Sequence, residues 1–191
     1  SGPETQDCLR ARLKELGGEL IANPENRGLA AALNQGIARA EQLGCEWVLT
    51  FDQDSHPSQG MMKALIATAK ASPQPERVAV VGPRIVEERF PSQIQRFIQP
   101  TWWGFRRVSC DQQDLHGVMQ LITSGALTNV RHWRALGGFN ESLFIEYVDY
   151  EYCLRARLAG LELRVSAKAL LIHNLGTRQE RSFFGKKFLP T

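Results

Sequence analysis

The sequence of 191 residues lacks several features that mark specialised classes of protein. It has no apolar run near the ~20 residues that a membrane-spanning helix needs. It has only four cysteines, which are widely spaced and form no C-x-x-C pair: Cys8, Cys45, Cys110 and Cys153. This usage is typical of reduced, mostly buried thiols, and it predicts a cytoplasmic protein.

Targeting signals and concentrated charge are also missing. The first residues show no basic segment followed by an apolar stretch, so we expect no signal peptide there. The net charge of +3 is dispersed, which is unlike the basic footprint of a nucleic-acid-binding protein, and we expect no nucleic-acid partner. Two basic stretches, Arg178–Arg181 and Lys186-Lys187, are either solvated surface or a peripheral contact with acidic phosphates or the anionic inner membrane face.

What is present fits one globular domain over residues 1–191, without repeats or low-complexity linkers. Apolar residues at helical spacing predict an amphipathic helix from Leu29 to Leu43. The unbroken run Trp47–Phe51 predicts a buried strand. Further helices are predicted at 8–16, 58–71 and 148–158, and further strands at 19–22, 77–81, 118–123, 126–130, 161–165 and 170–172. This alternation predicts an α/β fold with a mixed, mainly parallel sheet flanked by helices, and the polar, aromatic segment 90–120 predicts a hairpin or loop excursion.

Two aspartates follow the predicted strand 47–51 directly, as Asp52-Gln53-Asp54. Ligand sites in open α/β sheets lie at the carboxyl ends of strands. Two carboxylates one residue apart in a loop can converge on one hard cation such as Mg²⁺, which uses one or two protein carboxylates and fills its shell with phosphate and water. Capping of the next helix by Asp54 or Ser55 is the simpler alternative.

Two other classes of protein also use closely spaced aspartates. An EF-hand loop needs Gly at its sixth position and Glu at its twelfth, and Pro57 and Lys63 stand there instead, which excludes it. A phosphatase with an aspartyl-phosphate nucleophile also places D-x-D after an apolar strand. It would need a downstream lysine and a further acidic pair, which the order of motifs does not clearly supply.

A second acidic cluster contains Glu146, Asp149 and Glu151. Asp149 falls near the start of the predicted helix 148–158, where the helix dipole favours an ionised carboxylate. An ionised aspartate that faces a cleft can accept a proton from a sugar hydroxyl as a general base. The alternative is that these are capping and surface charges.

These patterns occur in an order that resembles the family 2 glycosyltransferases of the GT-A fold, most closely the bacterial rhamnosyltransferases that build surface polysaccharides. The resemblance extends from about Leu9 to Gly176. Its motifs are Asn26-Arg27-Gly28-Leu29-Ala30, Leu49-x-Phe51-Asp52-Gln53-Asp54-Ser55, Gly137-Gly138-Phe139-x-Glu141 continuing to Val148-Asp149, and Cys153-x-Arg155. It implies inverting transfer of a sugar, rhamnose in the nearest case, from dTDP-rhamnose or a UDP-sugar to a saccharide or lipid-linked acceptor.

The resemblance also implies a role for each matched residue. Asp52 and Asp54 would hold Mg²⁺ or Mn²⁺ on the donor diphosphate, and His173 would complete the metal site, which favours Mn²⁺. Asp149 would be the catalytic base, with Glu146 as second choice. Residues near the donor would be Asn26, Arg27, Gly28, Ser124, Gly125 and Arg155, the last pairing with an acidic residue of the site or with phosphate. Trp102, Trp103 and Phe105 would stack on the acceptor sugar or pack in the core.

The family opens with a strand, a helix and a second strand that grip the nucleoside, and these elements do not precede the predicted helix 8–16. We therefore expect a chain cut short at its N-terminus, with exposed strand edges that could support a homo-oligomer. Two alternatives to the transferase stay open, namely a non-catalytic remnant of the fold and the aspartyl-phosphate phosphatase.

Overall fold

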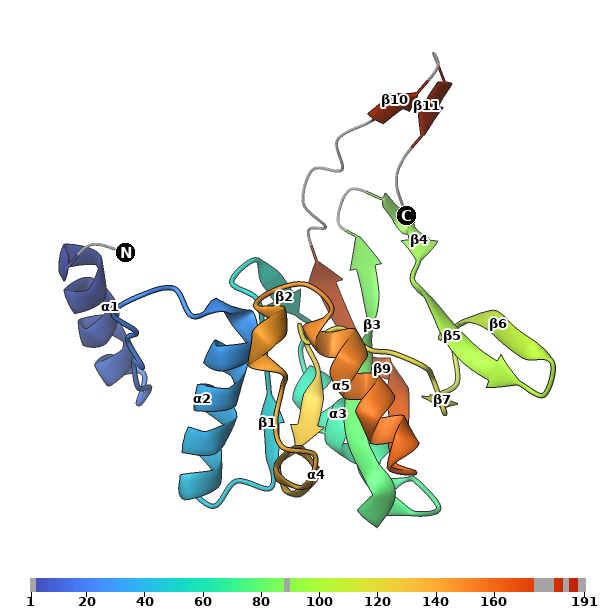
Figure 1. The fold of residues 1–191 in the computed structure, drawn as a ribbon, viewed down its shortest axis with the longest axis horizontal. Helices are drawn as coiled ribbons and strands as arrows, with labels where there is room; N and C mark the ends of the chain where they lie inside the picture. Colours follow the sequence, from blue (N-terminus) through green and yellow to red (C-terminus); the bar gives the residue numbers. More distant parts are fainter. Residues whose placement is uncertain (1–2, 88–89, 174–180, 184–185, 189–191) are drawn as a thin grey trace.

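The computed structural model describes residues 3–87, 90–173, 181–183 and 186–188. Their centre is a seven-stranded sheet in the order β1-β8-β3-β9-β2, with β4 added beside β3 and β7 beside β9 (Figure 1). The strands are β1 (Trp47–Leu49), β2 (Ser55–Pro57), β3 (Val78–Glu87), β4 (Phe90–Ile94), β7 (Leu115–His116), β8 (Leu127–Asn129) and β9 (Glu162–His173). Two hairpins stand apart, one of β5 (Arg96–Thr101) and β6 (Gly104–Ser109), the other of β10 (Arg181–Phe183) and β11 (Lys186–Phe188).

Helices cover both faces of the sheet because two separate apolar clusters form on it. The helices are α1 (Pro3–Glu15), α2 (Gly28–Gln42), α3 (Met61–Lys70), α4 (Val130–Ala135) and α5 (Val148–Leu158), with 3-10 turns at Pro75–Arg77 and Glu141–Leu143. One cluster joins α2 and α5 to Val80 and Leu163 of the central strands. The other joins α3 to Val78 and Val81. The neighbours Val80 and Val81 therefore face opposite sides of the sheet, and Val78 joins the Val81 side because the pairing of β3 with β9 shifts register between Val78 and Val80.

The predicted α/β class with a helix-flanked mixed sheet is confirmed, but the strand pairing is less parallel than expected. Among the described strands only β3 and β9 pair in parallel, and every other pair is antiparallel. The reason is β8, which lies between β1 and β3 and is antiparallel to both. Strands β1, β3 and β9 still run in the same direction, so their carboxyl ends share one edge.

The predicted helices at 8–16, 29–43, 58–71 and 148–158 correspond to α1, α2, α3 and α5. Two strand predictions are wrong, since residues 19–22 and 118–123 form no strand. The strands predicted at 161–165 and 170–172 are both parts of β9, which continues past a register shift beside Pro83. The excursion predicted at 90–120 is confirmed and contains the β5–β6 hairpin.

Candidate active site

The Asp52-Gln53-Asp54 turn follows β1 and is braced by the Ser124-Gly125 turn that precedes β8. The Asp52 N–H donates to Ser124 Oγ at 3.2 Å, and the hydroxyl oxygens of Ser124 and Ser55 lie 2.6 Å apart. Ser124 is 2% exposed, whereas the side chains of both aspartates are exposed. The turn is therefore held by a buried hydroxyl group, and its two aspartates are exposed.

Close backbone contact locks the two turns together. The Gly125 N–H donates to the Thr50 carbonyl at 2.7 Å, and the Thr50 N–H donates to the Ala126 carbonyl at 3.1 Å. Gly125 has φ of +74°, and a Cβ there would lie 2.9 Å from side-chain atoms of Leu171 and Pro83. Only glycine fits this position without a shift.

The late histidine lies on the neighbouring strand. His173 ends β9, and its backbone is the register partner of Ser55 in β2. Its side chain lies outside the described part of the structure, so its role as a metal ligand stays a prediction. Among the described residues, no three His, Cys, Asp or Glu side chains gather to hold a metal. Two carboxylates completed by phosphate and water are a donor set that suits Mg²⁺ or Mn²⁺.

Asp149 lies in the first turn of α5 and is half-buried. Burial raises the pKa of its carboxyl, hydrogen bonding to backbone N–H groups lowers it, and the charge of Asp52 raises it further. The Tyr150 N–H donates to Asp149 Oδ1 at 2.8 Å. The fold thus brings the two acidic motifs into the same electrostatic environment. Glu146 lies in the exposed loop just before the helix.

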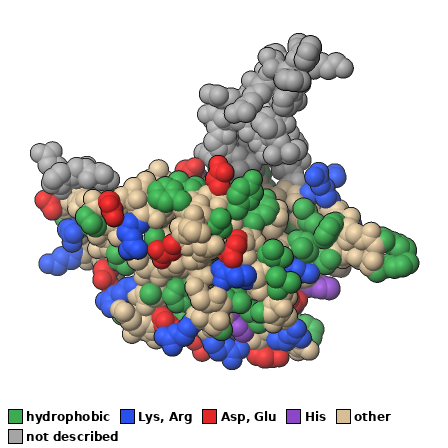
Figure 2. Space-filling model, viewed as in Figure 1, with side chains coloured by type: hydrophobic (Ala, Val, Ile, Leu, Met, Phe, Trp, Pro, Cys, Tyr) green, Lys and Arg blue, Asp and Glu red, His purple; other side chains and the backbone are tan. Residues whose placement is uncertain are grey.

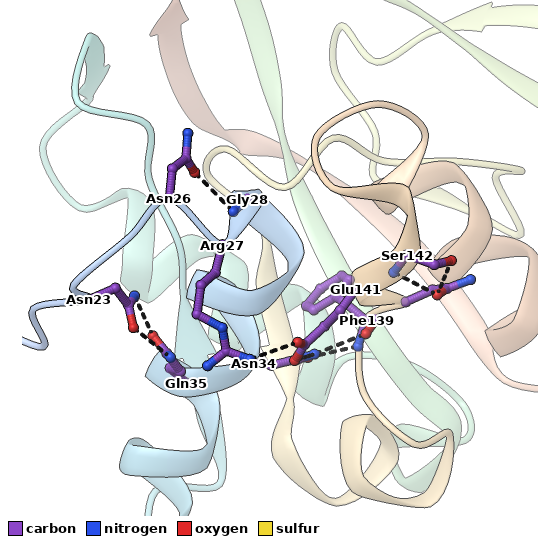
Figure 3. A network of polar contacts seen from close by, with 10 residues as sticks. Asn23, Asn26, Arg27, Gly28, Asn34, Gln35, Phe139, Glu141 and Ser142 are labelled. Carbon is purple, nitrogen blue, oxygen red and sulfur yellow. Dashed lines mark hydrogen bonds and ion pairs between the residues drawn. The ribbon is translucent and has the colours of Figure 1, made fainter.

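The loop that leads into α5, which contains Glu146, docks on the N-terminus of α2 (Figure 3). The carbonyl oxygen of Phe144 accepts hydrogen bonds from the N–H groups of Leu29 at 2.7 Å and Ala30 at 3.3 Å. A Cβ on Gly28, which has φ of +83°, would lie 2.6 Å from that oxygen. The loop itself contains two non-glycine residues with positive φ, Phe144 at 59° and Tyr147 at 62°, a conformation that the surrounding contacts must stabilise.

The predicted donor residues Asn26, Arg27 and Gly28 take part in this docking. Asn26 Oδ1 accepts from the Gly28 N–H at 3.0 Å, and Arg27 forms an exposed ion pair with Glu141 at 3.3 Å. Asn26 thus bonds within the turn before α2, and the N-cap residue Arg27 makes no side-chain cap bond to the helix. Contact of these residues with a nucleotide stays a prediction, and it would have to replace or share these bonds.

Asn34 of α2 positions the Gly-Gly-Phe motif, a role that was not predicted from the sequence. Its amide Nδ2 donates to the carbonyl of Phe139 at 2.9 Å and to Glu141 at 3.0 Å. Its Oδ1 accepts from the Phe139 N–H at 2.8 Å and from Trp133 Nε1 at 3.1 Å. A Cβ on Gly138 would lie 2.8 Å from that Oδ1. The Gly-Gly-Phe motif is thus shaped around one amide side chain.

Arg155 secures the same motif from α5. It forms a two-contact ion pair with Glu151 and donates to the carbonyls of Leu136 and Gly138. Of the two partners predicted for Arg155, the structure shows the acidic one. These bonds use most of its guanidinium donors, so the arrangement assigns it to holding the loop rather than to phosphate.

Two cavities lie away from these acidic residues. One of about 560 Å³ includes Trp47 and Arg131, and one of about 600 Å³ includes Arg77 and Glu162. Both lie near the amino ends of the central strands. We place the site at the opposite edge, because Asp52 follows the carboxyl end of β1 and its charge raises the pKa of Asp149. Open α/β sheets bind ligands at that edge.

Comparison with known proteins decides the family. The model of glycosyl transferase family 2 matches residues 3–136. The chain belongs to glycosyl transferase family 2. The match gives the D-x-D turn a glycosyltransferase context and removes the support for the phosphatase alternative.

Curated relatives agree with this assignment. The chain is 28% identical over 162 residues to a dTDP-rhamnosyl transferase, RfbF, of Shigella flexneri, covering 83% of this chain and 53% of that protein. It is 26% identical over 182 residues to a pre-mycofactocin glycosyltransferase of Mycobacterium tuberculosis, covering 90% and 36%. This family 2 glycosyltransferase thus spans about half, or less, of the length of these relatives.

A solved structure confirms the GT-A fold. The chain superposes with a TM-score of 0.69 on GalNAc-T7, whose crystal structure contains UDP, GalNAc and Mn²⁺. The match covers 97% of this chain and 37% of that chain, at 13% identity. In the described residues no helix has the length and apolar character needed to cross a membrane.

Proposed function

We propose that the chain is the catalytic core of an inverting glycosyltransferase with Asp149 as its base. The observation that carries this proposal is the placement of Asp149 at the start of α5, half-buried and within the electrostatic reach of Asp52. A metal-binding turn and a base must lie close together, because the donor's anomeric carbon is attached to the diphosphate and the acceptor hydroxyl attacks that carbon.

The raised pKa of Asp149 suits this role. A carboxylate with a raised pKa accepts a proton more readily than an exposed aspartate, as a general base must. Asp149 would take the acceptor's hydroxyl proton as the oxygen attacks the face of the sugar opposite the leaving diphosphate. The anomeric carbon is then inverted through an oxocarbenium-like transition state. Glu146 is the alternative base.

Asp52 and Asp54 would bind Mg²⁺ or Mn²⁺ with the donor diphosphate, and His173 would be a further ligand. When bound, the cation would offset the charge that develops on the departing nucleoside diphosphate. The turn at Ser124 and Gly125 would lie beside the donor sugar, since it supports the Asp52 backbone. The exposure of both aspartates supports this assignment.

For the donor we propose dTDP-rhamnose, which is supported by the name of the Shigella relative. A UDP-sugar is the alternative, supported by the UDP bound in GalNAc-T7. The acceptor we propose is a saccharide or lipid-linked glycan of a cell-surface polysaccharide. The basic stretches at 178–187 that suggested a peripheral membrane contact lie mostly outside the described residues.

Calorimetric titration of the chain with dTDP and UDP, with and without Mn²⁺, tests the donor site. We expect saturable binding that needs the metal and is lost in the Asp52→Asn, Asp54→Asn double variant. Asp149→Asn should keep nucleotide binding and lose sugar transfer, while Glu146→Gln should keep both. A folded wild-type chain that binds neither nucleotide would support the non-catalytic alternative for this chain.

A further inference from the structure

The β5–β6 hairpin carries the most exposed aromatic group of the described structure. Trp102, Trp103 and Phe105 are 85%, 76% and 71% exposed. The two indoles form the turn, and their ring centroids lie 3.8 Å apart. Figure 2 shows the resulting hydrophobic group at the far right, where the hairpin projects from the body in Figure 1. Packing of these rings in the core, one of the two roles predicted for them, is wrong.

The stem of the hairpin is fixed, so the tip is held outward rather than loose. Phe97 is 3% exposed and belongs to the main core. Gln99 is 7% exposed, and its amide donates to the His116 carbonyl at 2.7 Å. The Met119 N–H donates to the Ile98 carbonyl at 2.7 Å. Only the turn and the residues beside it extend past these anchors.

The charges around the tip have one sign. Segment 90–109 contains three arginines and no carboxylate; Arg106 and Arg107 lie toward the tip, and Arg96 lies at the base of the hairpin, opposite Ser109. All three are exposed, and none forms an ion pair within the described part of the chain. Arg106 also donates to Gln99 Oε1 at 2.9 Å, which holds its guanidinium along the hairpin.

We propose that the β5–β6 tip docks on an anionic lipid surface, with the two indoles and Phe105 in the interfacial layer and with Arg106 and Arg107 against lipid phosphates. Indole rings favour the membrane–water interface because they are amphipathic. Clustered arginines near the surface add electrostatic attraction to anionic headgroups. A neutral sugar explains the rings but not Arg106 and Arg107, because sugar hydroxyls would not need two cations without a carboxylate. This inference does not depend on the proposed transferase activity.

Sedimentation of the chain with phosphatidylcholine vesicles, with and without phosphatidylglycerol, tests the proposal. We expect binding only to the anionic vesicles. Loss of about 60 Å² of buried apolar surface changes partitioning about tenfold, so Trp102→Ala, Trp103→Ala should weaken binding at least that much. Each arginine is worth about fivefold, so Arg106→Gln, Arg107→Gln should weaken it roughly 25-fold.

Control variants elsewhere on the surface separate the contribution of the tip from a general loss of charge or of exposed apolar surface. Arg10→Gln, Lys14→Gln on α1 removes the same charge from an exposed site, and Leu158→Ala removes an apolar side chain that is 79% exposed. Neither should change vesicle binding. The Lys186→Gln, Lys187→Gln variant shows in the same assay how much the basic tail contributes to vesicle binding. Brominated lipids should quench the fluorescence of the wild-type chain and not that of the double tryptophan variant.

Three results would overturn the proposal. The first is anionic vesicle binding that survives both tip variants. The second is equal binding to neutral vesicles. The third is a tip-dependent dimer in sedimentation velocity without lipid, or a tip-dependent loss of affinity for a water-soluble glycan acceptor with vesicle binding unchanged, either of which would give the rings a different partner.

Discussion

Replacing Gly28 by alanine tests whether the docking of the acidic loop on α2 holds the site together. A Cβ at Gly28 would lie 2.6 Å from both the carbonyl oxygen and the ring Cδ2 of Phe144. The φ of +83° costs a non-glycine residue about 1–2 kcal/mol, and over-packing of a close contact typically adds about 1–3 kcal/mol. We expect Gly28→Ala to lower the free energy of unfolding by about 2–5 kcal/mol.

Gly60 is a matched control for the backbone part of this cost. It has φ of +80°, also stands at a helix N-terminus, and has nothing within 4 Å of an added Cβ. Gly60→Ala should therefore cost only about 1–2 kcal/mol. Urea denaturation followed by circular dichroism measures both variants, and nucleotide binding of each folded variant shows whether the site follows the loop.

The difference between the two variants isolates the contact with Phe144. If Gly28→Ala and Gly60→Ala agree within about 0.5 kcal/mol, the normal error of such comparisons, the loop moves aside without cost. The argument that this docking positions the acidic cluster would then be refuted.

Two further predictions concern neighbouring groups. Asn34→Ala leaves the Trp133 Nε1 and the Phe139 backbone without their partner, so it should lower the free energy of unfolding by about 2–4 kcal/mol. The control Gln35→Ala breaks only the pair with Asn23 and should lower the free energy of unfolding clearly less. An equal loss in the two variants would contradict the role of Asn34. Because the pKa of Asp149 is raised in the folded state, its ionisation destabilises the fold. Asp149→Asn should therefore raise the Tm at neutral pH, and this gain should shrink as pH falls through the raised pKa and vanish below the ordinary pKa. A gain that grows on acidification would show the opposite sign of shift.

The helices could be predicted because their signals are local. The apolar spacing and Gly44 predict the end of α2 to within one residue. The helix predicted at 148–158 has the same bounds as α5. The failed strand at 19–22 has β-prone residues but no neighbouring strand to pair with in the described structure. Conversely, β2 contains Pro57 and has only three residues, and it exists because β9 runs beside it. The pairing of two strands that are distant in the sequence cannot be predicted from either strand alone.

Some features of the site could likewise be predicted from the sequence, and others could not. The carboxylates could be predicted because chemistry restricts which side chains bind a metal or move a proton. The sequence predicted that Ser124 lies near the donor sugar, but not that its hydroxyl group supports the Asp52 backbone. The docking of the loop on α2 could not be predicted, because it uses the main-chain carbonyl of Phe144, which every residue type possesses. The glycine at position 28 was the available signal, since it marks a close backbone approach.

The clamp formed by Arg155 affects how mutational scans of this protein should be interpreted. A scan scored only by product formation would rank Arg155 beside the acidic residues, because its loss frees the Leu136 and Gly138 carbonyls and leaves Glu151 without its cation. The same scan scored by abundance of folded protein would separate them. Arg155 would fail both scores, whereas Asp149→Asn would fail the first and pass the second. Scoring both distinguishes residues that carry out the reaction from residues that keep its framework assembled.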